Sequence, residues 1–137
     1  MGEVRTEITL VNIGDQEIAN RGYMPQEQVR RLTVNAVVDT GAWTLVINEA
    51  VREKLGLRVK ETLDTTLAGG GKVPSQVTER VEIRWKDRDS SCKAVVLPGE
   101  ADVLLGALPL EEMDLMIHPK TREVVGAHGD TIRSVVK

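Results

Sequence analysis

The sequence is poor in aromatic residues and contains a single cysteine. Phenylalanine is absent, and two tryptophans and one tyrosine stand among 137 residues, so branched aliphatic side chains have to build the core. These side chains are restricted in their first torsion and pack well on a pleated surface, which favours strands. The lone Cys92 excludes an intrachain disulfide framework and is typical of a reducing compartment.

Long apolar runs and a strong charge of either sign are also missing. The chain has 18 Lys plus Arg against 21 Asp plus Glu, a formal net charge of -3. No run approaches the roughly eighteen apolar residues of a membrane span, and residues 1–30 contain no apolar segment of the signal-peptide type. The mild acidity offers no footprint for nucleic acid or an anionic membrane. We therefore expect a cytoplasmic protein without nucleic-acid or membrane partners.

Length and patterning predict one domain spanning residues 1–137. A chain of this size buries roughly two-thirds of its unfolded surface, which is enough to fold without metal or disulfides. No internal repeat, low-complexity segment or linker divides the sequence.

Alternating apolar and polar residues predict a mainly β chain. Period-two patterns cover residues 4–10, 32–38 and 73–85, and shorter strands are predicted at residues 93–97, 101–105, 115–117, 124–125 and 131–136. Asn48 and Gly56 have the positions of an N-cap and a left-handed C-cap around a short helix, and residues 108–113 predict another helical turn. Residues 12–28 are polar and carry no pattern. Gly69-Gly70-Gly71 predicts the tip of a hairpin.

An acid lies in the turn after the second predicted strand. Asp39-Thr40-Gly41-Ala42 directly follows Ala36-Val37-Val38. A carboxylate at the end of a rigid strand can reach a cleft, and Gly41 allows backbone amides to approach and orient it. The alternative interpretation is an Asx-turn that only closes the strand end. Asp102, which precedes an apolar run, is the other acid considered for an intrachain pair.

The order of these features resembles the retropepsin-like family of small aspartic peptidases, from about residue 32 to residue 125. It comprises an apolar strand, Asp-Thr-Gly-Ala, a second apolar strand, a short helix, a glycine-rich hairpin and Val103-Leu104-Leu105-Gly106. The resemblance implies a closed-barrel-like retropepsin fold with one or two short helices. Asp39 would be the catalytic acid, Thr40 would brace two catalytic loops across a dimer axis, and Gly41 would be the close-approach position. Residues 68–73 would form a flap, and residues 104–106 would pass behind the site.

A single Asp-Thr-Gly triplet implies a homodimer, because this chemistry needs two carboxylates that share a water and a proton. Retroviral members carry Arg-Asp or Arg-Asn where this chain has Ala107-Leu108, so their intersubunit ion pair is missing. The terminal segments, residues 3–11 and 131–136, are the candidates for holding the dimer together.

The expected activity is endopeptidase cleavage of a peptide or protein substrate, without metal or cofactor. The predicted substrate-binding residues surround the acid and the flap: Ala42, Trp43, Gly69, Gly70, Gly71, Val73 and Leu108, with Val46 as a further pocket candidate. An extended peptide would add as a strand between flap and cleft floor. His118, His128 and Cys92 lack the spacings of zinc sites. Two alternatives stay open: a catalytically silent dimeric peptide-binding or assembly module of the same fold, and a small β-barrel interaction domain.

Overall fold

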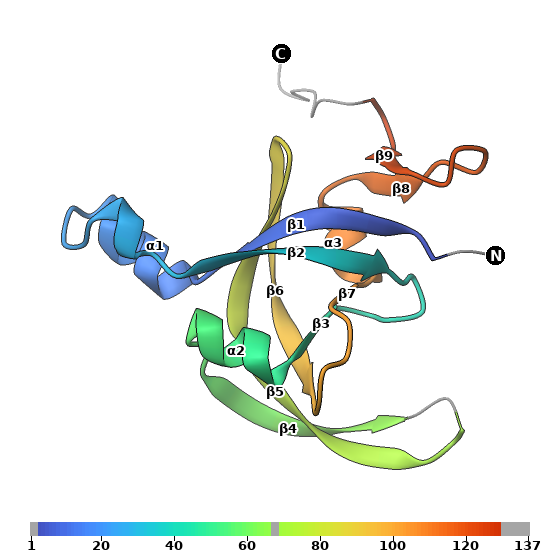
Figure 1. The fold of residues 1–137 in the computed structure, drawn as a ribbon, viewed down its shortest axis with the longest axis horizontal. Helices are drawn as coiled ribbons and strands as arrows, with labels where there is room; N and C mark the ends of the chain where they lie inside the picture. Colours follow the sequence, from blue (N-terminus) through green and yellow to red (C-terminus); the bar gives the residue numbers. More distant parts are fainter. Residues whose placement is uncertain (1–2, 67–68, 130–137) are drawn as a thin grey trace.

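The chain folds mostly into strands, as the sequence predicted (Figure 1). The computed structural model describes residues 3–66 and 69–129. Its strands are β1 Arg5–Val11, β2 Arg31–Val38, β3 Leu45–Asn48, β4 Val59–Thr66, β5 Lys72–Trp85, β6 Arg88–Leu97, β7 Leu104–Leu105, β8 Leu115–Ile117 and β9 Val124–Gly126. The helices are α1 Ile13–Asn20, α2 Glu49–Leu55 and α3 Ala107–Glu112, with a 3-10 turn, η1, at Gln26–Gln28. No helix in the described ranges is long and apolar enough to cross a membrane.

The main sheet closes into a ring. Its strand order is β1-β2-β7-β3-β6-β5-β4, and an additional antiparallel pairing joins β1 to β5 through Thr9 and Arg84. β4 stays outside this ring and pairs with the first half of β5. In Figure 1 the β4–β5 hairpin therefore projects away from the other strands. The closed, mainly β fold inferred from the sequence is confirmed.

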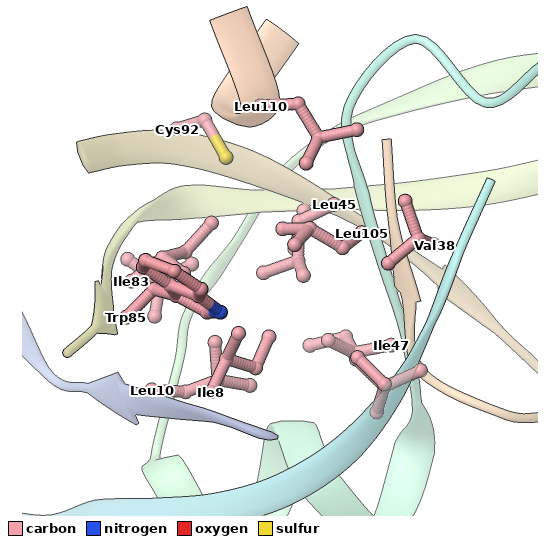
Figure 2. Packing of buried hydrophobic residues seen from close by; sticks show 14 of the residues in the cluster. Ile8, Leu10, Val38, Leu45, Ile47, Ile83, Trp85, Cys92, Leu105 and Leu110 are labelled. Atoms are coloured by element: carbon pink, nitrogen blue, oxygen red, sulfur yellow. The ribbon is translucent and has the colours of Figure 1, made fainter. Parts of the chain in front are cut away.

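Aliphatic side chains fill the interior of the ring, as the scarcity of aromatic residues requires (Figure 2). Ile8, Leu45 and Ile83 are almost completely buried there. Trp85 is buried with them. Its indole Nε1 donates a hydrogen bond to Thr6 Oγ1 at 2.8 Å, so the one polar atom of the indole is paired. Cys92 also lies in this core, and burial raises the pKa of its thiol.

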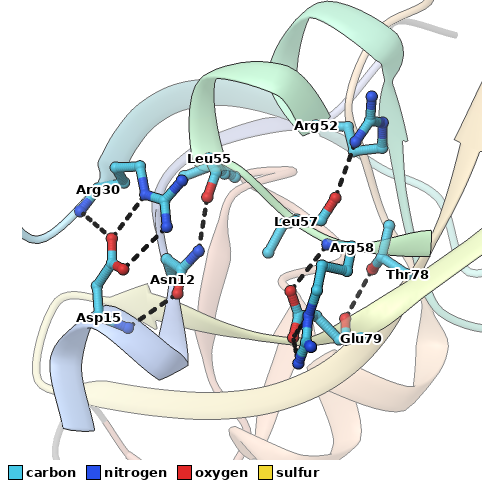
Figure 3. A network of polar contacts seen from close by, with 9 residues as sticks. All are labelled: Asn12, Asp15, Arg30, Arg52, Leu55, Leu57, Arg58, Thr78 and Glu79. Atoms are coloured by element: carbon cyan, nitrogen blue, oxygen red, sulfur yellow. Dashed lines mark hydrogen bonds and ion pairs between the residues drawn. The ribbon is translucent and has the colours of Figure 1, made fainter. Parts of the chain in front are cut away.

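Polar contacts hold the two N-terminal helices together (Figure 3). Asn12 caps α1 by accepting from the Asp15 N–H, and its Nδ2 donates to the Leu55 carbonyl oxygen at the end of α2, at 2.7 Å. Arg30 donates from Nε and Nη2 to the Asp15 carboxylate at 2.7 and 2.9 Å. α1 thus forms in the segment where no element was predicted, because tertiary hydrogen bonds rather than an apolar stripe stabilise it.

The caps predicted for the next helix are present. Asn48 accepts from the Val51 N–H at 2.9 Å, and Gly56 ends α2 with a φ of 64°. A side chain on Gly56 would also meet the Arg30 guanidinium. The left-handed φ is the reason that glycine is favoured there, and a side chain would in addition make the flexible Arg30 move.

A buried arginine fixes the C-terminal hairpin of β8 and β9. The Arg88 side chain has no exposed surface, and it donates to the carbonyl oxygens of Met113, Asp114 and Gly129 at 2.9, 2.6 and 2.5 Å. The strand predicted at residues 131–136 lies outside the described residues.

Candidate active site

A set of short hydrogen bonds defines the acid turn, residues 39–42. The Asp39 N–H donates to the Leu105 carbonyl oxygen at 3.0 Å, which holds the end of β2 against β7. Asp39 Oδ1 accepts from the Gly41 N–H at 2.9 Å, and the Ala42 N–H donates to the Asp39 carbonyl oxygen at 3.0 Å. These bonds give the carboxylate a fixed direction. The bond from the Gly41 N–H to Asp39 Oδ1 makes this an Asx-turn, and that bond also orients the carboxylate.

The segment behind the turn packs so closely that only glycine fits. A Cβ atom on Gly106 would lie 2.2 Å from the Thr44 carbonyl oxygen and 2.6 Å from that of Ala42. Directly after it, the Ala107 N–H donates to the Ala42 carbonyl oxygen at 2.8 Å. The start of α3 and the acid turn are therefore one rigid unit.

A cleft of about 670 Å³ opens beside Asp39. The acid turn contributes Asp39, Gly41 and Ala42 to its lining, and Trp43 follows them. Aliphatic residues of β3, β6 and β7 line it as well: Val46, Val95, Leu97 and Leu104. β4 of the projecting hairpin adds Leu63, Asp64 and Thr66. The cleft is thus mostly apolar around the oriented Asp39, with a strand of the hairpin, which carries Asp64, along its side.

The predicted substrate-binding residues are distributed over four places. Ala42 and Trp43 line the cleft together with Asp39. Gly69, Gly70 and Gly71 lie at the exposed tip of the β4–β5 hairpin, outside the cleft lining. Leu108 also lies outside the lining, in the first turn of α3 beside Trp43. Val73 lines a neighbouring groove of about 570 Å³ with Pro74, Gln76 and Val96.

The cleft residues on β4 were not predicted from the sequence. β4 is exposed along its described positions, so Leu63, Asp64 and Thr66 show no half-buried alternation. The one signal was the glycine triplet, which predicts a hairpin and hence a strand before it. Asp64 gives the cleft a second carboxylate, and no basic side chain stands among the described residues that line it.

The remaining candidate residues lie elsewhere. Asp102 pairs with Arg5 on the surface, Oδ2 to Nη2 at 3.2 Å, and does not line the cleft. His128 contacts Asp114 at 2.7 Å in the exposed C-terminal region. Thr40 is exposed, and its hydroxyl has no hydrogen-bond partner within the described part of this one chain.

The sequence match identifies the family. The family described as aspartyl protease matches residues 27–107, which is more than half of the chain, and the protein belongs to this family. The match ends directly after Gly106, so β1, α1, most of α3, β8 and β9 lie outside it. No curated protein matches the sequence.

Two solved structures of viral proteases are similar. The EIAV protease in complex with the inhibitor HBY-793 shares 25% identity over 58% of this chain and 75% of that chain, with a TM-score of 0.45. The protease of simian foamy virus (mac) shares 19% identity over 58% of this chain and 81% of that chain, with a TM-score of 0.44.

Proposed function

We propose that this protein is an aspartic endopeptidase that acts as a homodimer, with Asp39 of each copy at the two-fold axis. The observation that carries the proposal is the fixed carboxylate of Asp39 in an apolar cleft, at the end of a strand in a chain of the aspartyl protease family. The sequence holds one Asp-Thr-Gly triplet, so a second copy has to supply the second acid.

The proposed reaction is hydrolysis of a peptide bond by an activated water. Two carboxylates about 3 Å apart cannot both ionise, and the acid pair of aspartic proteases is the standard example of this effect. The ionised Asp39 takes a proton from water as the water oxygen attacks the peptide carbonyl carbon, while the protonated Asp39 donates to the carbonyl oxygen. As the C–N bond of the tetrahedral intermediate breaks, the Asp39 that took the proton from water gives it to the departing amine nitrogen. The other Asp39 takes a proton from a hydroxyl of the intermediate, so a carboxylic acid remains and the pair is restored. The apparent pKa values of this reaction belong to the pair.

Substrate recognition follows from the projecting hairpin. β4 is the edge strand of the sheet in the described part of the chain. An extended peptide can therefore lie along the hairpin and form backbone hydrogen bonds, while its alternate side chains enter the cleft. The apolar surfaces of Val46, Val95 and Leu104 favour aliphatic or aromatic substrate side chains. The exposed hydroxyl of Thr40 would make the bracing contact with the partner copy.

The test is cleavage of a diverse peptide library from pH 3 to 8 by concentrated protein, with Asp39→Asn as the matched variant. Asparagine keeps the size and the hydrogen bond from the Gly41 N–H, so folding and dimerisation should be retained. Cuts made by the wild type and abolished in the variant support aspartic peptidase chemistry. Equal cutting by both proteins indicates a contaminant. No cutting by either protein where both are dimeric supports the silent peptide-binding module instead.

A further inference from the structure

We infer that Trp43 and Leu108 are the apolar anchor of the dimer, docking against the same two residues of a second copy. This inference rests on the proposed homodimeric function and names the surface that holds the two copies together. The sequence lacks the arginine that would provide an ion pair after Gly106, so another contact has to stabilise the dimer.

Trp43 and Leu108 are two exposed apolar residues that lie next to each other beside the acid turn. Trp43 is 57% exposed and Leu108 is 42% exposed. The Leu108 N–H donates to the Trp43 carbonyl oxygen at 3.1 Å, so the two residues are neighbours although they are far apart in the sequence. The close packing of Gly106 fixes both backbones in advance. Docking a partner on this surface therefore orders little backbone, which lowers the entropic cost of association.

Symmetry brings this surface to the dimer axis. The two Asp39 carboxylates have to approach within about 3 Å of each other to share a proton. Residues of the same rigid unit then lie close to the axis, where a two-fold interface places each surface against its own copy. Trp43 is separated from Asp39 by only three residues and lines the same cleft.

The charge pattern around Asp39 suits a partner with the same surface. Apart from Asp39 itself, residues 40–48 and 103–110 contain no charged side chain. Two copies can therefore meet here without like-charge repulsion beyond the acid pair, which one shared proton relieves. Uncharged interface centres with an exposed tryptophan are typical of binding hot spots.

The N-terminal strand leaves little room for a different arrangement. β1 pairs with β2 along its whole length and with β5 from Thr9 to Val11, so much of its backbone is already hydrogen-bonded within the ring. The Val38 N–H also donates to the Val4 carbonyl oxygen at 2.8 Å. A dimer sheet formed by residues 3–11 could therefore use only the edge of Arg5–Ile8 that faces away from β2.

The test measures self-association by sedimentation velocity over a concentration series. The double variant Trp43→Gln, Leu108→Gln should dimerise at least about 30-fold more weakly than the wild type. The control is Tyr23→Gln, which makes the same kind of change at an aromatic residue that is 83% exposed near the end of α1, and it should leave association unchanged. Both changes affect exposed side chains, and thermal melts verify that each variant folds.

A second arm separates association from substrate binding. Two copies of a Leu108→Gln variant joined by a flexible linker should cleave like the tethered wild type, because Leu108 lies outside the cleft lining and tethering replaces the lost contact. Unchanged dimerisation of the double variant, or a tethered variant that stays inactive, would overturn the inference and leave the proposed function intact. A wild type that stays monomeric and cleaves no peptide at any concentration would overturn the function as well.

Discussion

Replacing Gly106 with alanine should loosen the acid turn more than any other single-methyl addition near the site. The backbone of Gly106 has φ -89° and ψ -174°, which any residue adopts, so the cost is one of packing and not of conformation. The added Cβ would lie 2.2 Å from the Thr44 carbonyl oxygen, where ordinary contacts need about 3.4 Å. Either the acid turn or the start of α3 has to move by about 1 Å.

Two destabilising effects and one stabilising effect determine how far Gly106→Ala lowers the free energy of unfolding. Overpacking of this kind costs about 1–3 kcal/mol. The hydrogen bonds from Ala107 to Ala42 and from Leu108 to Trp43 lengthen, at a cost of about 1 kcal/mol each. Alanine restricts the unfolded chain and returns about 0.5 kcal/mol. The free energy of unfolding should fall by about 3 kcal/mol, which lowers the melting temperature by about 10 °C in a chain of this size.

The assay is urea denaturation followed by far-UV circular dichroism, with Gly71→Ala as the matched control. Gly71 lies at the hairpin tip, and a Cβ atom there would have no neighbour within 4 Å. Its free energy of unfolding should stay within about 0.5 kcal/mol of the wild type. An equally small change in Gly106→Ala would refute the claim that the acid turn and the start of α3 are one rigid unit.

Three further predictions concern groups outside the cleft. Hydrogen bonds from Arg30 lower the pKa of Asp15, so its contribution to stability is complete above the unfolded value near pH 4 and is lost as the pH falls through the lowered folded value. Asp15→Asn should therefore cost about 2 kcal/mol in urea titrations at pH 7 and clearly less at pH 2 to 3, and an equal loss at both pH values would contradict this. Cys92 is 1% exposed and burial raises its thiol pKa, so a thiol reagent should modify it only in denaturant; rapid labelling of the native protein would show that the core opens. Arg88→Met leaves three backbone carbonyls without their donor and should destabilise the protein by at least about 3 kcal/mol in thermal melts, whereas a wild-type melting temperature would mean that these bonds contribute nothing.

Strands with one buried face could be predicted from the sequence. Residues 4–10, 32–38 and 73–85 alternate cleanly and become β1, β2 and β5 within one or two residues. The caps of α2 could also be predicted, because Asn48 and Gly56 act on the backbone within one turn of the helix. β7 is shorter than expected, since only Leu104 and Leu105 meet partners in β2 and β3.

Elements that depend on distant polar contacts were not predictable. α1 has one buried residue, Asp15, and its partner Arg30 lies beyond the helix, so no apolar stripe marks it. β6 begins earlier than predicted because its first inward residues, Arg88 and Ser90, are polar and conceal the alternation. In each case the tertiary partner, and not the local pattern, determines the structure.

In the candidate site, too, the local part could be predicted from the sequence and the part that depends on tertiary contacts could not. The acid turn is local, so its position after β2 could be predicted from the sequence, whereas Gly106 behind it was expected only from the family resemblance. The cleft wall on β4 is not local: Leu63 and Asp64 reach the cleft only because the hairpin folds beside it. The sequence therefore pointed to Asp39 as the candidate acid, while the residues that line the cleft around it required the structure.

The most direct test of the two-acid site is a mixing experiment at constant total protein. Wild type and Asp39→Asn are combined, allowed to exchange subunits and assayed for cleavage of a peptide identified in the library. If each site needs Asp39 from both copies, activity falls as the square of the wild-type fraction, so an equal mixture retains about one quarter of the original rate. Retention of about three quarters of the rate would show that one Asp39 per dimer is sufficient, and a linear decrease to about one half would show that each copy acts alone; either result would contradict the proposed mechanism.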